Sequence, residues 1–192
     1  MSQLSAQSIR ELCTLASECQ PMISPFSEER HVVNGKSWGL SAASYDVRIA
    51  HDLVLGPNPG FYLHEAMTKV IALSFLDMWK FRNDLLDLPP PNALANTVEN
   101  FAIPDNVCGY VVDKSSYARV FVTAFNTLLD PGWKGNLTLE LVNLGPNPIE
   151  IKKGDPIVQI AFHWLDRPTD RPYNGKYNNQ PNRPVPAIYE GN

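Results

Sequence analysis

The chain has 192 residues, of which 44% are hydrophobic and 19% are charged, and its formal net charge is −4. This length suits one domain with a sizeable core. An acidic chain is a poor candidate for binding a nucleic acid polymer, because such binding depends on many contacts between basic side chains and phosphates. No apolar run reaches the roughly 18 residues of a membrane-spanning helix, and residues 1–20 lack the pattern of a secretion signal. We therefore expect neither a nucleic acid polymer nor a membrane as partner.

The three cysteines, Cys13, Cys19 and Cys108, are odd in number and widely spaced. Such spacing favours neither a disulfide framework nor a four-cysteine metal site. We expect each of them to be a small, buried hydrophobic residue. The expected compartment is the reducing cytoplasm, or the cytoplasm of a host if a virus encodes the chain.

The first 60 residues are predicted to contain one helix and one strand. Residues 4–18 have apolar side chains at helical spacing and predict a short amphipathic helix, which Ser5 or Ser8 would cap. Residues 21–44 are rich in Pro, Ser, Gly and Asn and predict mostly loop, whereas residues 44–50 alternate and predict a strand. The sequence GPNPG at 56–60 predicts a turn.

The segment from 61 to 96 differs from what precedes it. Residues 61–88 are rich in helix formers and apolar side chains, and we predict a helix over about 65–82. The prolines at the start of 88–96 are incompatible with regular structure, so we expect a linker or an exposed loop there.

From residue 97 the sequence consists of short β-rich runs between turn residues. Strands are predicted over 97–103, 107–112, 119–129, 136–143, 147–151 and 156–164. Short strands at regular spacing are typical of a β-sandwich or β-barrel. After about 166 the chain is polar and rich in proline, so this tail is predicted to be disordered or to become ordered over another surface.

A protein zinc site is not expected. Zinc-dependent deaminases of bases use a His-x-Glu sequence followed by Pro-Cys-x-x-Cys, and neither occurs in the chain. The four histidines are scattered and are interpreted as surface residues or as histidines with satisfied hydrogen bonds: His31, His51, His64 and His163.

The sequence DKSSYAR at 113–119 brings one lysine, two hydroxyls and one arginine together directly after an apolar run. Hydroxyls, backbone amides and arginine at the end of a strand can hold phosphate oxygens. An ordinary polar turn explains the same spacing, so both interpretations stay open from the spacing alone.

The run LTLEL at 137–141 alternates leucine with polar residues. On a strand, Leu137, Leu139 and Leu141 would share one face, and Glu140 would lie on the other. If the leucines point into the core, Glu140 faces either solvent or a subunit interface. A solvated glutamate on a strand remains the plain alternative.

Taken in order, KSSYAR, DPGWKGNLTLELVN, PIVQ and PYNGKYNNQ resemble the dCTP deaminase family of the trimeric dUTPase-like superfamily. The match is dense over about 98–180 and recognisable over 34–49. The resemblance implies a mainly β fold, a distorted β-barrel or jelly-roll, in one domain spanning 1–192. Within it, 1–30 would form an N-terminal helix and loop, 64–96 an insertion, and 166–192 a C-terminal lid.

The resemblance also implies a metal-independent deamination of dCTP to dUTP and ammonia. Glu140 would take a proton from water, and the resulting hydroxide would attack C4 of cytosine. Ser115 resembles the serine that orients this water. Arg119 resembles the arginine that fixes the charge geometry beside it.

The remaining matches concern substrate binding. Lys114, Ser115, Ser116 and Arg119 resemble the run that contacts phosphates, and Asp130 resembles the aspartate that meets the deoxyribose 3′-hydroxyl. Thr138 and Leu139 would read the base through backbone groups. The triphosphate side of the site would be formed by Gln159, Tyr173, Lys176 and Gln180. Mg²⁺ would arrive bound by the triphosphate, and dTTP is a candidate inhibitor.

Members of this family form homotrimers with sites between subunits, and a low charged fraction suits buried surface between copies. Two other functions stay open. Asp130 occupies a turn where related dUTPases activate water, so a dUTPase or a bifunctional enzyme releasing diphosphate is one alternative, although Trp133 is less usual than Tyr or Phe at its position. A non-catalytic trimer that binds nucleotides or a protein through the 64–96 segment is the other.

Overall fold

The computed structural model describes residues 2–14, 20–58, 60, 87–125 and 127–189. Over these residues the protein is mainly β, as the sequence predicts, with two helices, α1 (Ala6–Thr14) and α4 (Ser115–Ala118). The strands are β1 (Ser2–Gln3), β2 (Ile23–Ser24), β3 (His31–Val33), β4 (Lys36–Leu40), β5 (Tyr45–Arg48), β6 (Leu53–Leu55), β7 (Asn92–Ala102), β8 (Val107–Asp113), β9 (Val122–Ala124), β10 (Leu128–Leu129), β11 (Lys134–Asn143), β12 (Ile149–Ile151) and β13 (Pro156–Trp164).

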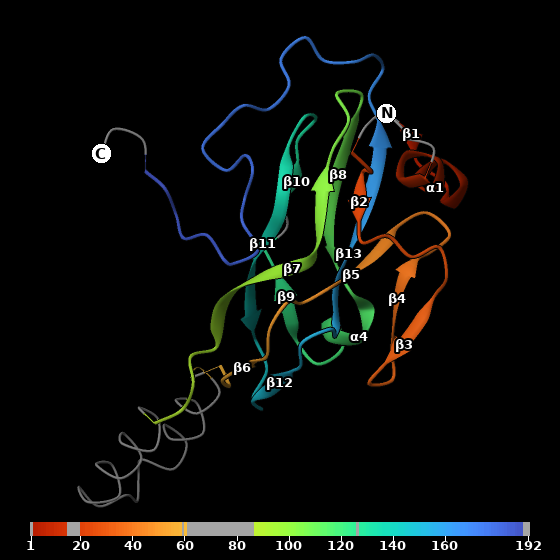
Figure 1. Ribbon diagram of the computed structural model, residues 1–192. Helices are drawn as coiled ribbons and strands as arrows, with labels where there is room; N and C mark the ends of the chain where they lie inside the picture. Colours follow the sequence, from red (N-terminus) through yellow and green to blue (C-terminus); the bar gives the residue numbers. More distant parts are fainter. Residues whose placement is uncertain (1, 15–19, 59, 61–86, 126, 190–192) are drawn as a thin grey trace, which may run out of the picture.

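The strands form three sheets (Figure 1). The largest follows the order β10-β8-β13-β5-β4-β3, with β1 added to β13. A second sheet has the order β2-β7-β11-β9, and β12 and β6 form a small third one. The named strand pairs are antiparallel, so short turns can connect neighbours, and strands of the two larger sheets contribute to one hydrophobic core.

The core is built by alternation along the strands. Tyr45 and Val47 of β5 and Phe162 of β13 are fully buried, as is Phe101 of β7. Phe101 packs beside the ring of Trp133, with 6.4 Å between ring centroids. The core therefore reaches the turn that precedes β11.

The helix predicted within 4–18 is present as α1. The hydroxyl oxygen of Ser5 accepts a hydrogen bond from the backbone N–H of Ser8 at 3.4 Å, so Ser5 acts as the cap. Ile9 and Cys13 are the buried side chains of this helix, one helical turn apart. Cys13 and Cys108 are buried, as predicted, and Cys19 lies outside the described residues.

Three expectations from the sequence were wrong in part. The predicted loop at 21–44 contains β2, β3 and β4, because a hairpin turn at Asn34 and Gly35, both with positive φ, pairs β3 with β4. The predicted linker at 88–96 contributes Asn92–Asn96 to β7, where they pair with β11. The predicted strand at 119–129 is divided into β9 and β10, and α4 ends just before it.

The predicted helix at 65–82 lies outside the described residues. Described residues on either side of it are in contact: the backbone N–H of Gly56 donates to the carbonyl of Pro90 at 2.8 Å. Beside it, the Asn143 side chain donates to the carbonyl of Gly56 at 2.8 Å. Among the described residues, no helix is long and apolar enough to cross a membrane.

Candidate functional site

A pocket of about 510 Å³ lies between β11, the turn before it, β10 and the C-terminal tail. It is lined by Leu94, Thr127, Leu128, Leu129, Asp130, Trp133, Leu137, Thr138, Glu140, Tyr173, Tyr177, Gln180, Val185 and Ala187. Five of the predicted site residues are in this lining: Asp130, Thr138, Glu140, Tyr173 and Gln180. In Figure 1 the tail, drawn in blue, runs alongside β10 and β11.

Glu140 lies on the pocket face of β11. Its neighbours Leu139 and Leu141 are each 1% exposed and belong to the core, whereas Glu140 is half-buried and lines the pocket. The alternation in LTLEL therefore predicted its direction correctly. Burial raises the pKa of Glu140 above its ordinary value, and the hydrogen bond from its own backbone N–H opposes this shift in part.

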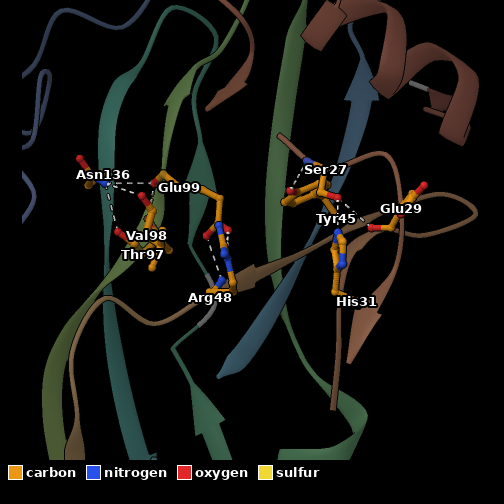
Figure 2. Close-up of polar contacts among 9 residues, drawn as sticks. All are labelled: Ser27, Glu29, His31, Tyr45, Arg48, Thr97, Val98, Glu99 and Asn136. Atoms are coloured by element: carbon orange, nitrogen blue, oxygen red, sulfur yellow. Dashed lines mark hydrogen bonds and ion pairs between the residues drawn. The ribbon is translucent and has the colours of Figure 1, made fainter. Parts of the chain in front are cut away.

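A local irregularity lies two residues before Thr138. Asn136 pairs with Asn100 and Thr138 with Asn96, so β7 has three residues opposite the single residue Leu137. The side-chain amide of Asn136 donates to the carbonyls of all three, at 3.1 to 3.3 Å (Figure 2). This contact satisfies backbone groups that the ladder leaves unpaired.

The same bulged segment contains a buried ion pair. Glu99 is fully buried and accepts from the Arg48 side chain at 2.8 Å and from its backbone N–H at 2.9 Å (Figure 2). Burial raises the pKa of Glu99, and the hydrogen bonds from Arg48 oppose that shift. The guanidinium of Arg48 also lies 3.8 Å from the centre of the Trp38 ring.

The tail is attached to β11 by Gln180. Its side-chain oxygen accepts from the backbone N–H of Thr138 at 3.2 Å and from the Thr138 hydroxyl at 2.8 Å. Gln180 also forms a parallel bridge with Gly135. The sequence left open whether this tail is disordered or ordered over a surface. In the described residues, the tail is ordered over β11.

Aromatic residues hold the tail at the turn before β11. The Trp133 indole N–H donates to the carbonyl of Tyr177 at 2.7 Å, and the backbone N–H of Tyr173 donates to the carbonyl of Pro131 at 2.7 Å. Asp130 is the first residue of this turn, and its backbone carbonyl accepts a hydrogen bond from the backbone N–H of Trp133 at 3.0 Å. The tail and the DPGWKG turn thus form one wall of the pocket.

The KSSYAR residues lie outside this pocket lining. Lys114 is buried and forms an ion pair with Asp46 at 2.9 Å. Ser115 is exposed, and its carbonyl accepts from the Arg119 guanidinium at 3.1 Å. The Ser116 hydroxyl is buried and has no hydrogen-bond partner among the described residues. Among the ion pairs of the described residues, none joins Arg119 to Glu140 of the same chain.

The other predicted site residues have different surroundings. Gln159 accepts from the Ser44 hydroxyl at 3.2 Å and donates to the carbonyl of Asp113 at 3.2 Å, next to Lys114. Lys176 is exposed, with its ammonium 5.5 Å from the centre of the Tyr177 ring. The side chain of Leu139 lies in the core, so only its backbone groups could contact a ligand.

Sequence reasoning missed several pocket residues in the tail. Tyr177, Val185 and Ala187 line the pocket, and the Val185 N–H donates to the Thr138 hydroxyl at 3.1 Å. An aromatic or apolar residue within a polar, proline-rich stretch is the signal that could have singled them out. Among the described residues, no three His, Cys, Asp or Glu side chains are grouped as metal ligands would be.

Comparisons with known proteins identify the family to which this chain is similar. A family model described as dCTP deaminase-like matches residues 3–165. A dCTP deaminase of Campylobacter concisus is 35% identical over 173 residues, which cover 87% of this chain and 90% of the relative. A dCTP deaminase of Aromatoleum aromaticum is 37% identical over 179 residues, which cover 89% of this chain and 93% of the relative.

Among solved structures, a 2′-deoxycytidine 5′-triphosphate deaminase from Agrobacterium tumefaciens is 18% identical with a TM-score of 0.49. The alignment covers 85% of this chain and 48% of that one. The native EIAV dUTPase is 15% identical with a TM-score of 0.44, covering 69% of this chain and 84% of that one. On the strength of the family match and of relatives that span most of its length, the chain belongs to the dCTP deaminase-like family.

Proposed function

We propose that the chain deaminates dCTP to dUTP and ammonia, with Glu140 as the residue that activates water. The observation that carries this proposal is the position of Glu140, half-buried in the pocket on the face of β11 opposite the core leucines. Relatives named dCTP deaminase give the substrate class.

The chemistry follows from one carboxylate acting first as base and then as acid. Glu140 takes a proton from water, and the hydroxide oxygen forms a bond to C4 of the cytosine ring. The carboxylic acid then delivers this proton to N3, and a second proton, from the new C4 hydroxyl, moves to the amino group. The C4–N bond breaks and ammonia leaves. A pKa raised by burial suits this role, because an acid–base catalyst works best with a pKa near the operating pH.

The pocket offers groups for the rest of the nucleotide. In this proposal, backbone groups of Thr138 and Leu139 read the base, and Asp130 contacts the deoxyribose 3′-hydroxyl. Thr138 and Asp130 both line the pocket. Lys114, Ser115, Ser116, Arg119 and Gln159 provide cationic and neutral donors for phosphate oxygens, together with Tyr173, Lys176 and Gln180 of the tail.

Mg²⁺ fits this donor set only as an ion carried by the nucleotide. The described residues contain no group of three acidic or imidazole ligands, and the phosphate-binding run offers lysine, arginine and hydroxyls instead. Hard cations of this kind are commonly held by triphosphate oxygens and water. When bound there, Mg²⁺ would neutralise phosphate charge.

A homotrimer with sites between copies accounts for two features of the single chain. Ser115 and Arg119 lie outside the pocket that contains Glu140. Apolar side chains near Glu140 are also exposed: Phe125 by 65%, Leu128 by 42% and Leu94 by 42%. A neighbouring copy would cover these side chains and bring its own α4 to the pocket.

The decisive experiment uses purified protein with dCTP and Mg²⁺ and measures ammonia together with the nucleotide products. Glu140→Gln should lower kcat by about 10²–10⁴-fold. Glu150→Gln is the matched control, because Glu150 is an exposed glutamate on β12 outside the pocket. Normal deamination by Glu140→Gln, or no ammonia from the wild-type protein, would refute the proposal.

Complementation tests the arrangement between copies. Glu140→Gln and Ser115→Ala proteins, unfolded and refolded together, should recover part of the activity if the two residues of one site come from different chains. Failure to recover activity in mixed trimers would contradict the intersubunit site. Light scattering on the same samples reports whether trimers form.

Asp130 in the same pocket favours one second candidate, release of diphosphate as well as ammonia. The product analysis distinguishes the two functions. Accumulation of dUTP indicates deamination alone, whereas dUMP and diphosphate indicate the bifunctional reaction. In that case Asp130→Asn should abolish diphosphate release, whereas ammonia release should continue at a higher KM for dCTP, because the contact with the deoxyribose is also weakened.

A further inference from the structure

A buried carboxylate, Asp155, joins three segments around helix α4. It is 2% exposed, and its Oδ2 accepts from the Tyr117 hydroxyl at 3.1 Å and from the Lys36 ammonium at 3.1 Å. Its Oδ1 accepts from the Asn34 side-chain amide at 2.7 Å, and the backbone N–H of Lys152 donates to Oδ2 at 3.3 Å. One side chain thus ties α4 to the β3–β4 hairpin and to the turn before β13.

Tyr117 is the residue of α4 that points into the protein. It is 3% exposed, whereas Ser115 and Arg119, on the same short helix and at its end, are exposed. The Lys36 ammonium lies 5.2 Å from the centre of the Tyr117 ring. A helix of four residues is too short to be stable by itself, so its tertiary contacts must determine its position.

The protonation states of Tyr117 and Asp155 favour the hydrogen bond between them. Burial alone would raise the pKa of Asp155, but the hydrogen bonds from Asn34 and Lys36 outweigh it and hold that pKa below its ordinary value. Burial raises the pKa of Tyr117, so its hydroxyl keeps its proton. The result is a neutral donor facing a carboxylate, which is a charge-assisted hydrogen bond.

We infer that Tyr117 is a positioning residue, whose hydroxyl contact with Asp155 holds Ser115 and Arg119 in the orientation that the reaction needs. This inference rests on the proposed function, because the roles of Ser115 and Arg119 belong to it. If α4 tilts, its exposed side chains move the farthest. A misplacement of about 1 Å in a catalytic group can cost about 10²-fold in rate.

The test compares two buried tyrosines that each lose one hydroxyl. Tyr45 is fully buried, and its hydroxyl oxygen accepts from the Ser27 N–H at 2.9 Å, so this hydroxyl contacts the segment before β3 rather than α4. Both Tyr117→Phe and Tyr45→Phe should lower the melting temperature by about 2–4 °C. Tyr117→Phe alone should lower kcat for dCTP by about tenfold or more. Equal kcat values for the two variants would overturn the inference.

A double-variant cycle tests whether Tyr117 acts through Asp155. Asp155→Asn keeps an oxygen acceptor but removes the charge. If the effect passes through this carboxylate, the double variant should lose little more kcat than Asp155→Asn alone. Losses that multiply as independent effects would contradict this route.

Hydrogen exchange separates the inference from the proposed function. The backbone N–H groups of Tyr117, Ala118 and Arg119 bond to carbonyls within the 114–119 turn, so their exchange reports on α4 without turnover. These amides should exchange faster in Tyr117→Phe than in Tyr45→Phe, and unchanged exchange would refute the anchoring role. Failure of the wild-type protein to deaminate dCTP would refute the proposed function. The comparison of exchange rates would still test whether the Tyr117 hydroxyl anchors α4.

Discussion

The side-chain oxygen of Gln180 accepts hydrogen bonds from both the backbone N–H and the hydroxyl of Thr138, at 3.2 and 2.8 Å. These two donors face the pocket that contains Glu140. Any ligand that uses the same donors must share them with the tail or displace Gln180. The occupancy of the pocket and the position of the tail are therefore coupled.

Gln180→Ala should loosen the tail, because it removes both contacts with Thr138. The chain offers a clean reporter, since Lys176 precedes Tyr177, whereas Arg167, Arg171 and Arg183 each precede proline and resist trypsin. Cleavage after Lys176 should therefore become faster. KM for dCTP should rise by up to about 30-fold, because two lost hydrogen bonds of about 1 kcal/mol each amount to about 2 kcal/mol. Gln7→Ala, on the exposed face of α1, is the control.

Gly135→Ala should detach the tail by a different route. Gly135 has φ of 132°, and a Cβ there would lie 2.4 Å from the backbone nitrogen of Gln180. Gly35→Ala is the control for backbone strain, because Gly35 also has positive φ (73°) but has open space around the added carbon. Trypsin should cut after Lys176 faster in Gly135→Ala only. Equal cleavage in both variants would show that this close approach does not hold the tail.

Where no cation from a neighbouring copy reaches the carboxylate, Glu140→Gln should stabilise the folded protein at neutral pH. Because burial raises the pKa of Glu140 above the ordinary value of 4.5, the ionised side chain costs stability. That cost is present above the folded pKa and disappears as pH falls below 4.5, so the gain from glutamine should shrink in acid. Melting temperatures across the pH range measure this. A variant less stable than the wild type at neutral pH would indicate that a cation, such as Arg119 of a neighbouring copy, reaches Glu140.

Arg48→Met should destabilise the fold by about 3–5 kcal/mol, because it leaves the fully buried Glu99 carboxylate without its cation. Adding Glu99→Gln to this variant removes the uncompensated charge and should recover a large part of the loss. Urea denaturation of the single and double variants measures both effects. A double variant as unstable as Arg48→Met would mean that packing against Trp38, rather than charge, accounts for the loss.

The parts of the site that depend on local alternation could be predicted from the sequence. The leucines around Glu140 fixed its face, because side chains on a strand alternate with a period of two. The DPGWKG sequence was likewise predicted to be a turn, and Asp130 opens that turn just before β11. Both inferences need only neighbouring residues, and both residues line the pocket.

The rest depends on contacts between residues far apart in the chain. Side-chain hydrogen bonds join Gln180 to Thr138 and Tyr117 to Asp155, and no periodic pattern in the sequence predicts them. The single turn of α4 was interpreted as a polar turn or phosphate-binding run, because four residues are too few to show helical spacing. The start of β7 at Asn92 was missed because the prolines before it dominate the local pattern.

The hydrogen bond between Gly56 and Pro90 brings together the two points of the chain between which residues 57–89 are inserted. The entropy of closing a loop grows only slowly with its length. The sequence between Gly56 and Pro90 can therefore change in length during evolution at small energetic cost, while β6 and β7 keep their places. The same pair of residues marks an insertion site for a reporter domain, because neither residue lines the pocket.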